Sequence, residues 1–164
     1  MGMTACLAPI TASQFDALLE APDSISALVY PADRLERKGR LDLDKSWHGL
    51  HWLLTGDVWG GAFPLGAAIL RGEDIGPDIG MGPARFVTPE EVVRVAAALA
   101  DITEEELARR YDPVAMTAVK IYPAIWQDEG SGALVDYLLP YFRQLVRFYA
   151  DAAQRGDAVL QWIA

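Results

Sequence analysis

The chain has 164 residues, a length that suits one folded domain with a single hydrophobic core. Hydrophobic residues make up 52% of it and charged residues 23%, which is typical of a globular protein and unlike a disordered chain. The formal net charge of −9 repels phosphate backbones, so nucleic acid is not expected as a partner.

The first half of the chain predicts a short strand followed by helices. Thr11 and Gln14 have the spacing of a capping box, which favours a helix beginning at residue 12. Gly56 is typical of the residue that closes a helix. The basic stretch 34–40 is interpreted as a solvated helix end. The elements expected here are a strand over 3–10, helices over 12–21, within 23–35 and over 43–55, and a second short strand over 65–70.

The second half contains the clearest helix start in the sequence. Thr88 and Glu91 occupy the N-cap and N3 positions with a proline between them, so we expect the Thr88 side chain to accept a hydrogen bond from the first helical turn. Thr103 and Glu106 repeat the pattern. The elements expected here are an irregular loop over 71–83, a strand over 84–87, helices over 89–100, from 104, over 113–120 and over 140–155, and a last strand over 157–164. Together the patterns predict one α+β domain over 1–164, with several helices packed on a small sheet of short strands.

The cysteine content and the lengths of the apolar runs indicate in which part of the cell the protein is expected. The single cysteine, Cys6, excludes an intramolecular disulfide and a cysteine-based zinc site, and its place in the first strand predicts a buried, unreactive thiol. No apolar run reaches about 18 residues, so no membrane span is expected. The N-terminus lacks a basic stretch before an apolar segment, so the expected location is the cytoplasm.

Three stretches begin like known binding loops and then depart from them. Residues 61–66 have the glycine spacing of a phosphate-binding loop but lack the Lys and Ser or Thr that must follow. Residues 80–85 begin like a dinucleotide fingerprint, but Arg85 stands at the third glycine. The stretch from Asp42 begins like a calcium loop, but Trp47 stands at the turn glycine. No cofactor is therefore expected.

The helix expected over 43–55 has two different faces at about 100° per residue. The apolar stripe is predicted to face the core and consists of Leu43, Trp47, Leu50 and Leu54. A polar set shares another arc, with Trp52 at its edge, and consists of Asp44, His48, His51 and Thr55.

The polar set has a functional and a structural interpretation. In the first, Asp44 orients His48 as a base, or the two histidines ligate a metal. In the second, the set is a solvated stripe or Asp44 caps the helix. Two histidines make an incomplete metal site, so we expect no bound metal and at least one partly accessible histidine.

Two further segments contain residue types that are common at functional sites. Arg85 follows a glycine-rich loop and is suited either to an anion or, equally, to a carboxylate of the protein itself. The segment 122–129 places Tyr122 and Trp126 near prolines and ends in two carboxylates, a pattern interpreted as core packing followed by a solvated helix end.

Several motifs in order along nearly the whole chain resemble the YfbM-like family of small bacterial proteins. They include Asp-Lys-Ser-Trp-His-Gly-Leu-His at 44–51 and the stretches 1–3, 41–43, 53–56, 82–86, 110–113, 121–123 and 156–160. The resemblance implies a single α+β domain in a bacterial cytoplasm. It implies no activity, catalytic residue or cofactor.

The sequence is therefore compatible with two functions. The first is a non-catalytic binding or adaptor module, immunity-like, that engages a basic protein partner, because the acidic surface steers cations. The alternative is an enzyme or small-ligand-binding protein that uses the face of Asp44, His48 and His51, with Arg85 as an anion contact.

Overall fold

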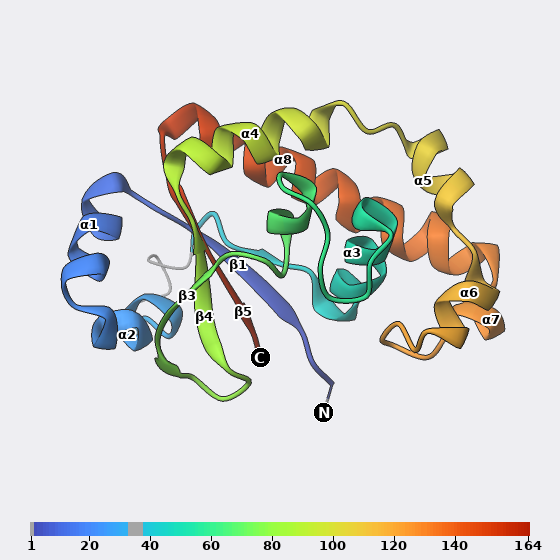
Figure 1. Cartoon of the computed structure of the whole chain (residues 1–164), viewed down its shortest axis with the longest axis horizontal. Coiled ribbons are helices and arrows are strands. Elements are labelled where there is room, and N and C mark those ends of the chain that lie inside the picture. The colour runs from blue at the N-terminus through green and yellow to red at the C-terminus, as the bar shows by residue number, and fades with distance from the viewer. Residues whose placement is uncertain (1, 33–37) are drawn as a thin grey trace.

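The computed structural model describes residues 2–32 and 38–164, and its centre is a five-stranded antiparallel sheet (Figure 1). The strands lie in the order β2-β1-β5-β4-β3. Their bounds are β1 Ala5–Ile10, β2 Leu41–Asp42, β3 Glu73–Asp78, β4 Pro83–Val87 and β5 Ala158–Ile163. β1 and β5 pair along their whole length, from Ala5 opposite Ile163 to Ile10 opposite Ala158. The first and last strands thus form the middle of the sheet.

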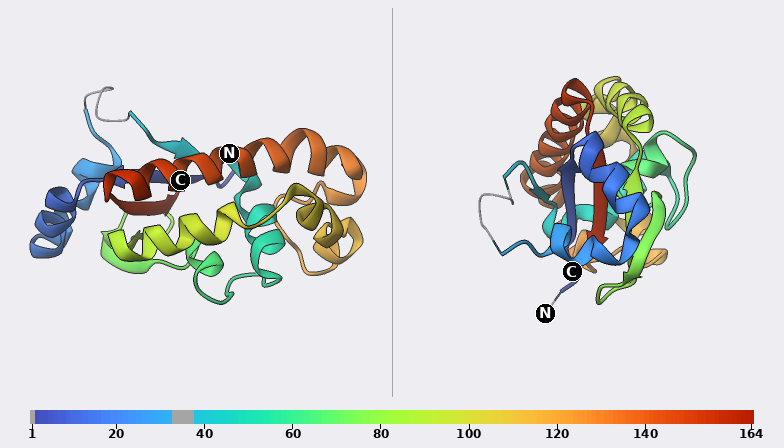
Figure 2. Two further views of the ribbon diagram at one scale, coloured as in Figure 1. Left: turned by 90° about the horizontal axis from the view of Figure 1, so that it is seen from above. Right: turned by 90° about the vertical axis from the view of Figure 1, so that its left-hand side faces the viewer.

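Eight α-helices pack around this sheet in the part of the chain that the structure describes. They are α1 Ala12–Glu20, α2 Ile25–Val29, α3 Trp47–Thr55, α4 Pro89–Ala100, α5 Glu104–Arg110, α6 Pro113–Ala118, α7 Trp126–Glu129 and α8 Leu139–Arg155. α4 and α8 run side by side over the sheet (Figure 2). The predicted α+β class is confirmed. None of the helices among the described residues has the length and apolar character needed to cross a bilayer.

Side chains of β5 alternate between the two faces of the sheet, as the geometry of a strand requires. Leu160 and Trp162 join a core with α1 and α2. Val159 joins the larger core, which α3, α4 and α8 build on the other face. The central strand therefore contributes to both cores.

The helix starts predicted from capping residues are confirmed. Thr88 accepts from the N–H of Glu91 at 3.3 Å, and the Glu91 carboxylate accepts from the N–H of Thr88 at 2.9 Å. The capping boxes at Thr11 and Thr103 are also complete. Gly156 ends α8 in the left-handed conformation, with φ of 72°. Local sequence therefore determines where these helices begin and end.

Residues 65–70 do not form the predicted strand. Leu65–Ala68 is a 3-10 helix, η4, packed against the preceding loop. A Cβ at Gly66 would lie 2.4 Å from the carbonyl oxygen of Gly61, so this close approach requires glycine. Tertiary packing of small residues, which an apolar run does not reveal, decides the conformation here.

The predicted irregular loop over 71–83 contains β3. This strand pairs with β4 although it includes Pro77, because an edge strand tolerates a residue that cannot donate to the ladder. The register shifts between Ile75 and Asp78, where Gly76 has a φ of 73°. The glycines and proline suggested a loop, whereas they form an irregular edge strand.

The region predicted to hold a helix within 23–35 is helical at Ile25–Val29, as α2. Residues 33–37, with most of the basic stretch 34–40, lie outside the described residues. Arg40 donates to the backbone carbonyls of Leu28 and Val29. Its guanidinium thus links the residue directly before β2 to the C-terminal end of α2.

Cys6 is half-buried, not buried as predicted. Even so, burial and the neighbouring Asp42 raise the pKa of its thiol to about 11, which keeps the thiol protonated at neutral pH.

Candidate functional site

The helix predicted over 43–55 begins later than expected. α3 starts at Trp47, and Asp44–Ser46 is a separate 3-10 turn, η3. Asp44 has a φ of 48°, and its backbone N–H donates to the Asp42 carboxylate at 2.7 Å. Because Asp44 lies outside the α-helix, helical spacing does not place it beside His48. The predicted apolar stripe is buried, including Trp47.

His48 is buried, with 1% of its surface exposed, and both ring nitrogens are occupied. Its Nδ1 accepts from the N–H of Tyr122 at 3.0 Å, and its Nε2 lies 2.8 Å from the carbonyl oxygen of Val58. An N–H only donates and a carbonyl only accepts, so His48 is the neutral tautomer with its proton on Nε2. Burial lowers its pKa. Instead of serving as a base, His48 joins α3 to two loops.

His51 is fully buried, and neither ring nitrogen has a hydrogen-bond partner of normal geometry among the described residues. Burial, followed by the proximity of His48, lowers its pKa to about 4, against the weaker opposite influence of Asp57. The expectation that one histidine is accessible is therefore wrong. The loop after α3 covers this helix face, as the contact of Val58 with His48 shows.

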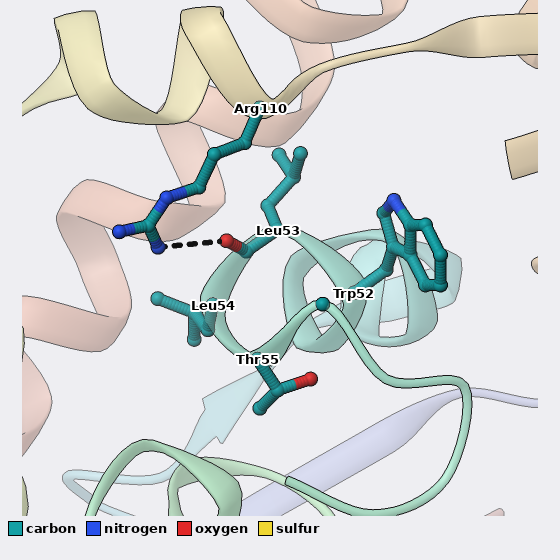
Figure 3. Close-up of a pocket in the computed structure, with 6 residues that line it drawn as sticks. Trp52, Leu53, Leu54, Thr55 and Arg110 are labelled. Atoms are coloured by element: carbon teal, nitrogen blue, oxygen red, sulfur yellow. Dashed lines mark hydrogen bonds between the residues drawn. The ribbon is translucent and has the colours of Figure 1, made fainter. Parts of the chain in front are cut away.

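Trp52 lies at a pocket of about 400 Å³ at the C-terminal end of α3 (Figure 3). Arg110 reaches across this pocket from α5 and donates to the carbonyl oxygen of Leu53 at 3.1 Å. The last carbonyls of a helix carry negative partial charge, so this guanidinium caps α3. Neither histidine is among the residues that line this pocket, so Trp52 lies apart from the predicted polar set.

Arg85 lies on β4, where its Nε donates to the Asp74 carboxylate at 3.1 Å. Of the two roles left open for Arg85, the structure thus shows the carboxylate partner. Arg85 also lines a pocket of about 270 Å³ with Trp59 and Met81.

Asp44 opens onto a separate pocket of about 650 Å³, which we call the acidic pocket. Its lining consists of Asp44, Lys45, Pro123, Ile125, Glu129, Gly132, Asp136 and Tyr137. The hydroxyl of Tyr137 donates to Asp44 Oδ2 at 2.7 Å. Asp136 and Tyr137 lie on η5 (Ala133–Leu138), a π-helical turn directly before α8. Such turns are frequent at functional sites.

The acidic pocket favours a cation. Burial and the Asp44 carboxylate raise the pKa of Tyr137, so its hydroxyl remains a donor that holds Asp44 in place. Burial and Asp44 also raise the pKa of Tyr141, whose ring lies 5.4 Å from that of Tyr137. Three carboxylates line the pocket against one lysine. No cluster of His, Cys, Asp or Glu in the described ranges has the arrangement of a metal site.

Sequence reasoning found Asp44 but missed the residues that complete its pocket. Tyr137 is 93 residues away in the chain, and Asp136 and Glu129 were not linked to Asp44 by any spacing. The segment 122–129 was interpreted as structural, and the burial of Trp126 agrees with this. However, the same segment supplies Pro123, Ile125 and Glu129 to the pocket.

The fold defines a small antiparallel α+β domain, and three of its surface hollows lie at or next to α3. A family model described as a domain of unknown function, DUF1877, matches residues 1–162, so the chain belongs to that family.

Two comparisons agree with this membership. The chain is 27% identical over 167 residues to protein YfbM of Escherichia coli (strain K12), covering 98% of this chain and 97% of that protein. The crystal structure of YfbM from Escherichia coli, described as a protein of unknown function, aligns with a TM-score of 0.72 and 23% identity. This structural alignment covers 98% of this chain and 99% of that one. The YfbM-like resemblance is confirmed, and these relatives assign no function.

Proposed function

We propose that this protein is a non-catalytic binding module that engages a basic protein partner through the acidic pocket. The observation that carries the proposal is the joint presence of Asp44, Glu129 and Asp136 around one hollow. The net charge of −9 supports it, because a strongly acidic protein attracts cationic partners over long range. The single cysteine suits a reducing compartment, and we place the module in the cytoplasm.

The lining of the pocket suits a lysine or arginine side chain. Such a side chain has an apolar stem and a charged head. Pro123 and Ile125 offer apolar surface to the stem, and the carboxylates of Glu129 and Asp136 offer acceptors to the head. Asp44 is already held by Tyr137, so one acceptor is oriented before a partner arrives.

The enzymatic alternative is not supported by the geometry. Both nitrogens of His48 are bonded to the backbone, and His51 is buried. Asp44 bonds Tyr137, and Arg85 pairs with Asp74. The two histidines therefore lie together in the interior, whereas Asp44 and Arg85 line two different pockets.

Titration with hexalysine and hexaglutamate, followed by calorimetry at low and moderate salt, tests the proposal. Hexalysine should bind, and its affinity should fall as the salt concentration rises. Hexaglutamate should not bind. The double variant Glu129→Gln with Asp136→Asn should bind hexalysine about fivefold more weakly, which corresponds to a loss of about 1 kcal/mol in binding free energy. A matched double variant on α1, Asp16→Asn with Glu20→Gln, removes the same charge elsewhere. Equal losses in the two variants would show that only net charge matters and would overturn the pocket's role.

A further inference from the structure

The hollow lined by Trp47 and Arg85 is unlike the acidic pocket. It has a volume of about 270 Å³, below the range of about 300–1,000 Å³ typical of small-molecule sites. Its lining is mostly apolar and consists of Met3, Trp47, Trp59, Leu70, Met81, Arg85 and Ile163. We call it the Trp59 pocket. Its size suits one side chain of a partner.

Two large apolar side chains at this pocket are exposed to solvent. Trp59 is 63% exposed and Met81 is 53% exposed. Tryptophan and methionine are enriched in protein interfaces, and tryptophan is frequent among the residues that dominate binding energy. They come from different elements, the loop after α3 and the turn between β3 and β4, yet both line one hollow.

Trp59 is held in position although it is exposed. Its ring centroid lies 4.5 Å from that of the buried His48. Its backbone N–H donates to Asp57 Oδ1 at 3.1 Å, and the neighbouring Val58 carbonyl is bonded to His48. An aromatic side chain that is ordered before binding loses little conformational entropy on binding.

The charges around the pocket indicate the kind of partner. Asp57 accepts the backbone N–H of Trp59, and Asp78 accepts those of Gly80 and Gly82 on either side of Met81, so one carboxylate lies close to each of the two exposed residues. The guanidinium of Arg85 is already paired with Asp74, and that of Arg71, next to Leu70, donates to the Gly61 carbonyl. These five charged residues comprise three carboxylates and two arginines, so the net charge beside the pocket is negative.

From these observations we infer that the Trp59 pocket docks a large apolar side chain that is flanked by lysines or arginines in a segment of a protein partner. The inference rests on the proposed function for the basic character of that partner. It adds a second contact, in which apolar burial supplies affinity and the carboxylates of Asp57 and Asp78 select the flanking cations.

The test uses two amidated, acetylated peptides, Lys-Lys-Leu-Lys-Lys and Lys-Lys-Ser-Lys-Lys, titrated into the 15N-labelled protein. The readout is the indole N–H signal of Trp59, which is assigned by its loss in Trp59→Ala. The leucine peptide should shift this signal and bind about tenfold more tightly than the serine peptide. Equal binding of the two peptides, or no response at Trp59, would overturn the inference.

Variants separate this pocket from the acidic one. Met81→Ala should remove most of the preference for leucine, and it changes a turn residue whose side chain is 53% exposed. Val114→Ala, at a residue 62% exposed on α6, should keep the preference. The Glu129→Gln with Asp136→Asn variant should weaken both peptides equally and leave their ratio unchanged, so failure of either pocket is recognised separately. Self-association of the protein that Met81→Ala abolishes would assign the pocket to a second copy and overturn the inference.

Discussion

His48 shows how one buried polar residue can hold two loops. It pairs with the carbonyl of Val58 and the N–H of Tyr122, so its loss leaves both backbone groups without their partner. We expect His48→Ala to lower the free energy of unfolding by about 2–3 kcal/mol. Urea denaturation followed by circular dichroism measures this, with the exposed Val114→Ala as control. A change no larger than that of the control would show that the two hydrogen bonds are dispensable.

The other histidine makes stability depend on pH. The pKa of His51 is lowered from 6.5 to about 4 by burial, so between these values the unfolded chain binds a proton that the folded protein does not. The stabilisation is therefore complete above pH 6.5 and is lost as the pH falls towards 4. The largest loss for this single group is about 3 kcal/mol.

Replacement of His51 by leucine tests this dependence. The variant lacks the titrating group, so its free energy of unfolding should fall less between pH 7 and pH 4 than that of the unaltered protein. The remaining fall belongs to the other titrating groups, including His48, whose pKa is also lowered. Parallel curves for the two proteins would contradict the buried, neutral state of His51.

For single residues of α3, the sequence predicted the burial of some side chains correctly and of others wrongly. The apolar stripe of α3 was predicted because helical spacing sorts large apolar side chains onto one face. The burial of the two histidines was not predicted. It arises because the loop that contains Val58 folds back over the polar face of α3. Long-range contacts of this kind leave no periodic signal.

Among the elements, α3 depends on a residue far from it in sequence. Arg110 donates to the Leu53 carbonyl from 57 positions away. We expect Arg110→Gln to lower stability by about 0.5–1 kcal/mol, which corresponds to about 2 °C in Tm. Arg109→Gln, one position earlier on α5, removes the same charge without this bond. Equal Tm values for the two variants would show that the cap is not stabilising.

Whether the boundary of an element could be predicted depends on how far apart in the sequence the residues that determine it lie. The starts of α1, α4 and α5 were predicted because each capping box lies within four residues. The start of α3 was not, because Asp42 and the φ of Asp44 interrupt the helix before Trp47. β3 was also missed, because its pairing with β4 outweighs the turn preference of Gly76 and Pro77.

Across the whole molecule, β5 is the element on which both cores depend. It pairs with β1 and β4 and contributes Val159 to one core and Leu160 to the other. We expect removal of residues 157–164 to abolish the cooperative thermal transition seen by circular dichroism. Leu19→Ala, at an exposed position of α1, should leave that transition intact. A truncated chain that still melts cooperatively would show that the sheet can close without its central strand.

The position of β5 also determines when the molecule can fold during its synthesis. β1 leaves the ribosome early, whereas the strand that pairs with its full length comes after all the other elements of the fold. Until β5 emerges, one long edge of β1 has no partner and neither core is closed. The nascent chain must therefore be protected from wrong strand pairing until β5 is available, and the native sheet forms only after the rest of the fold has been synthesised.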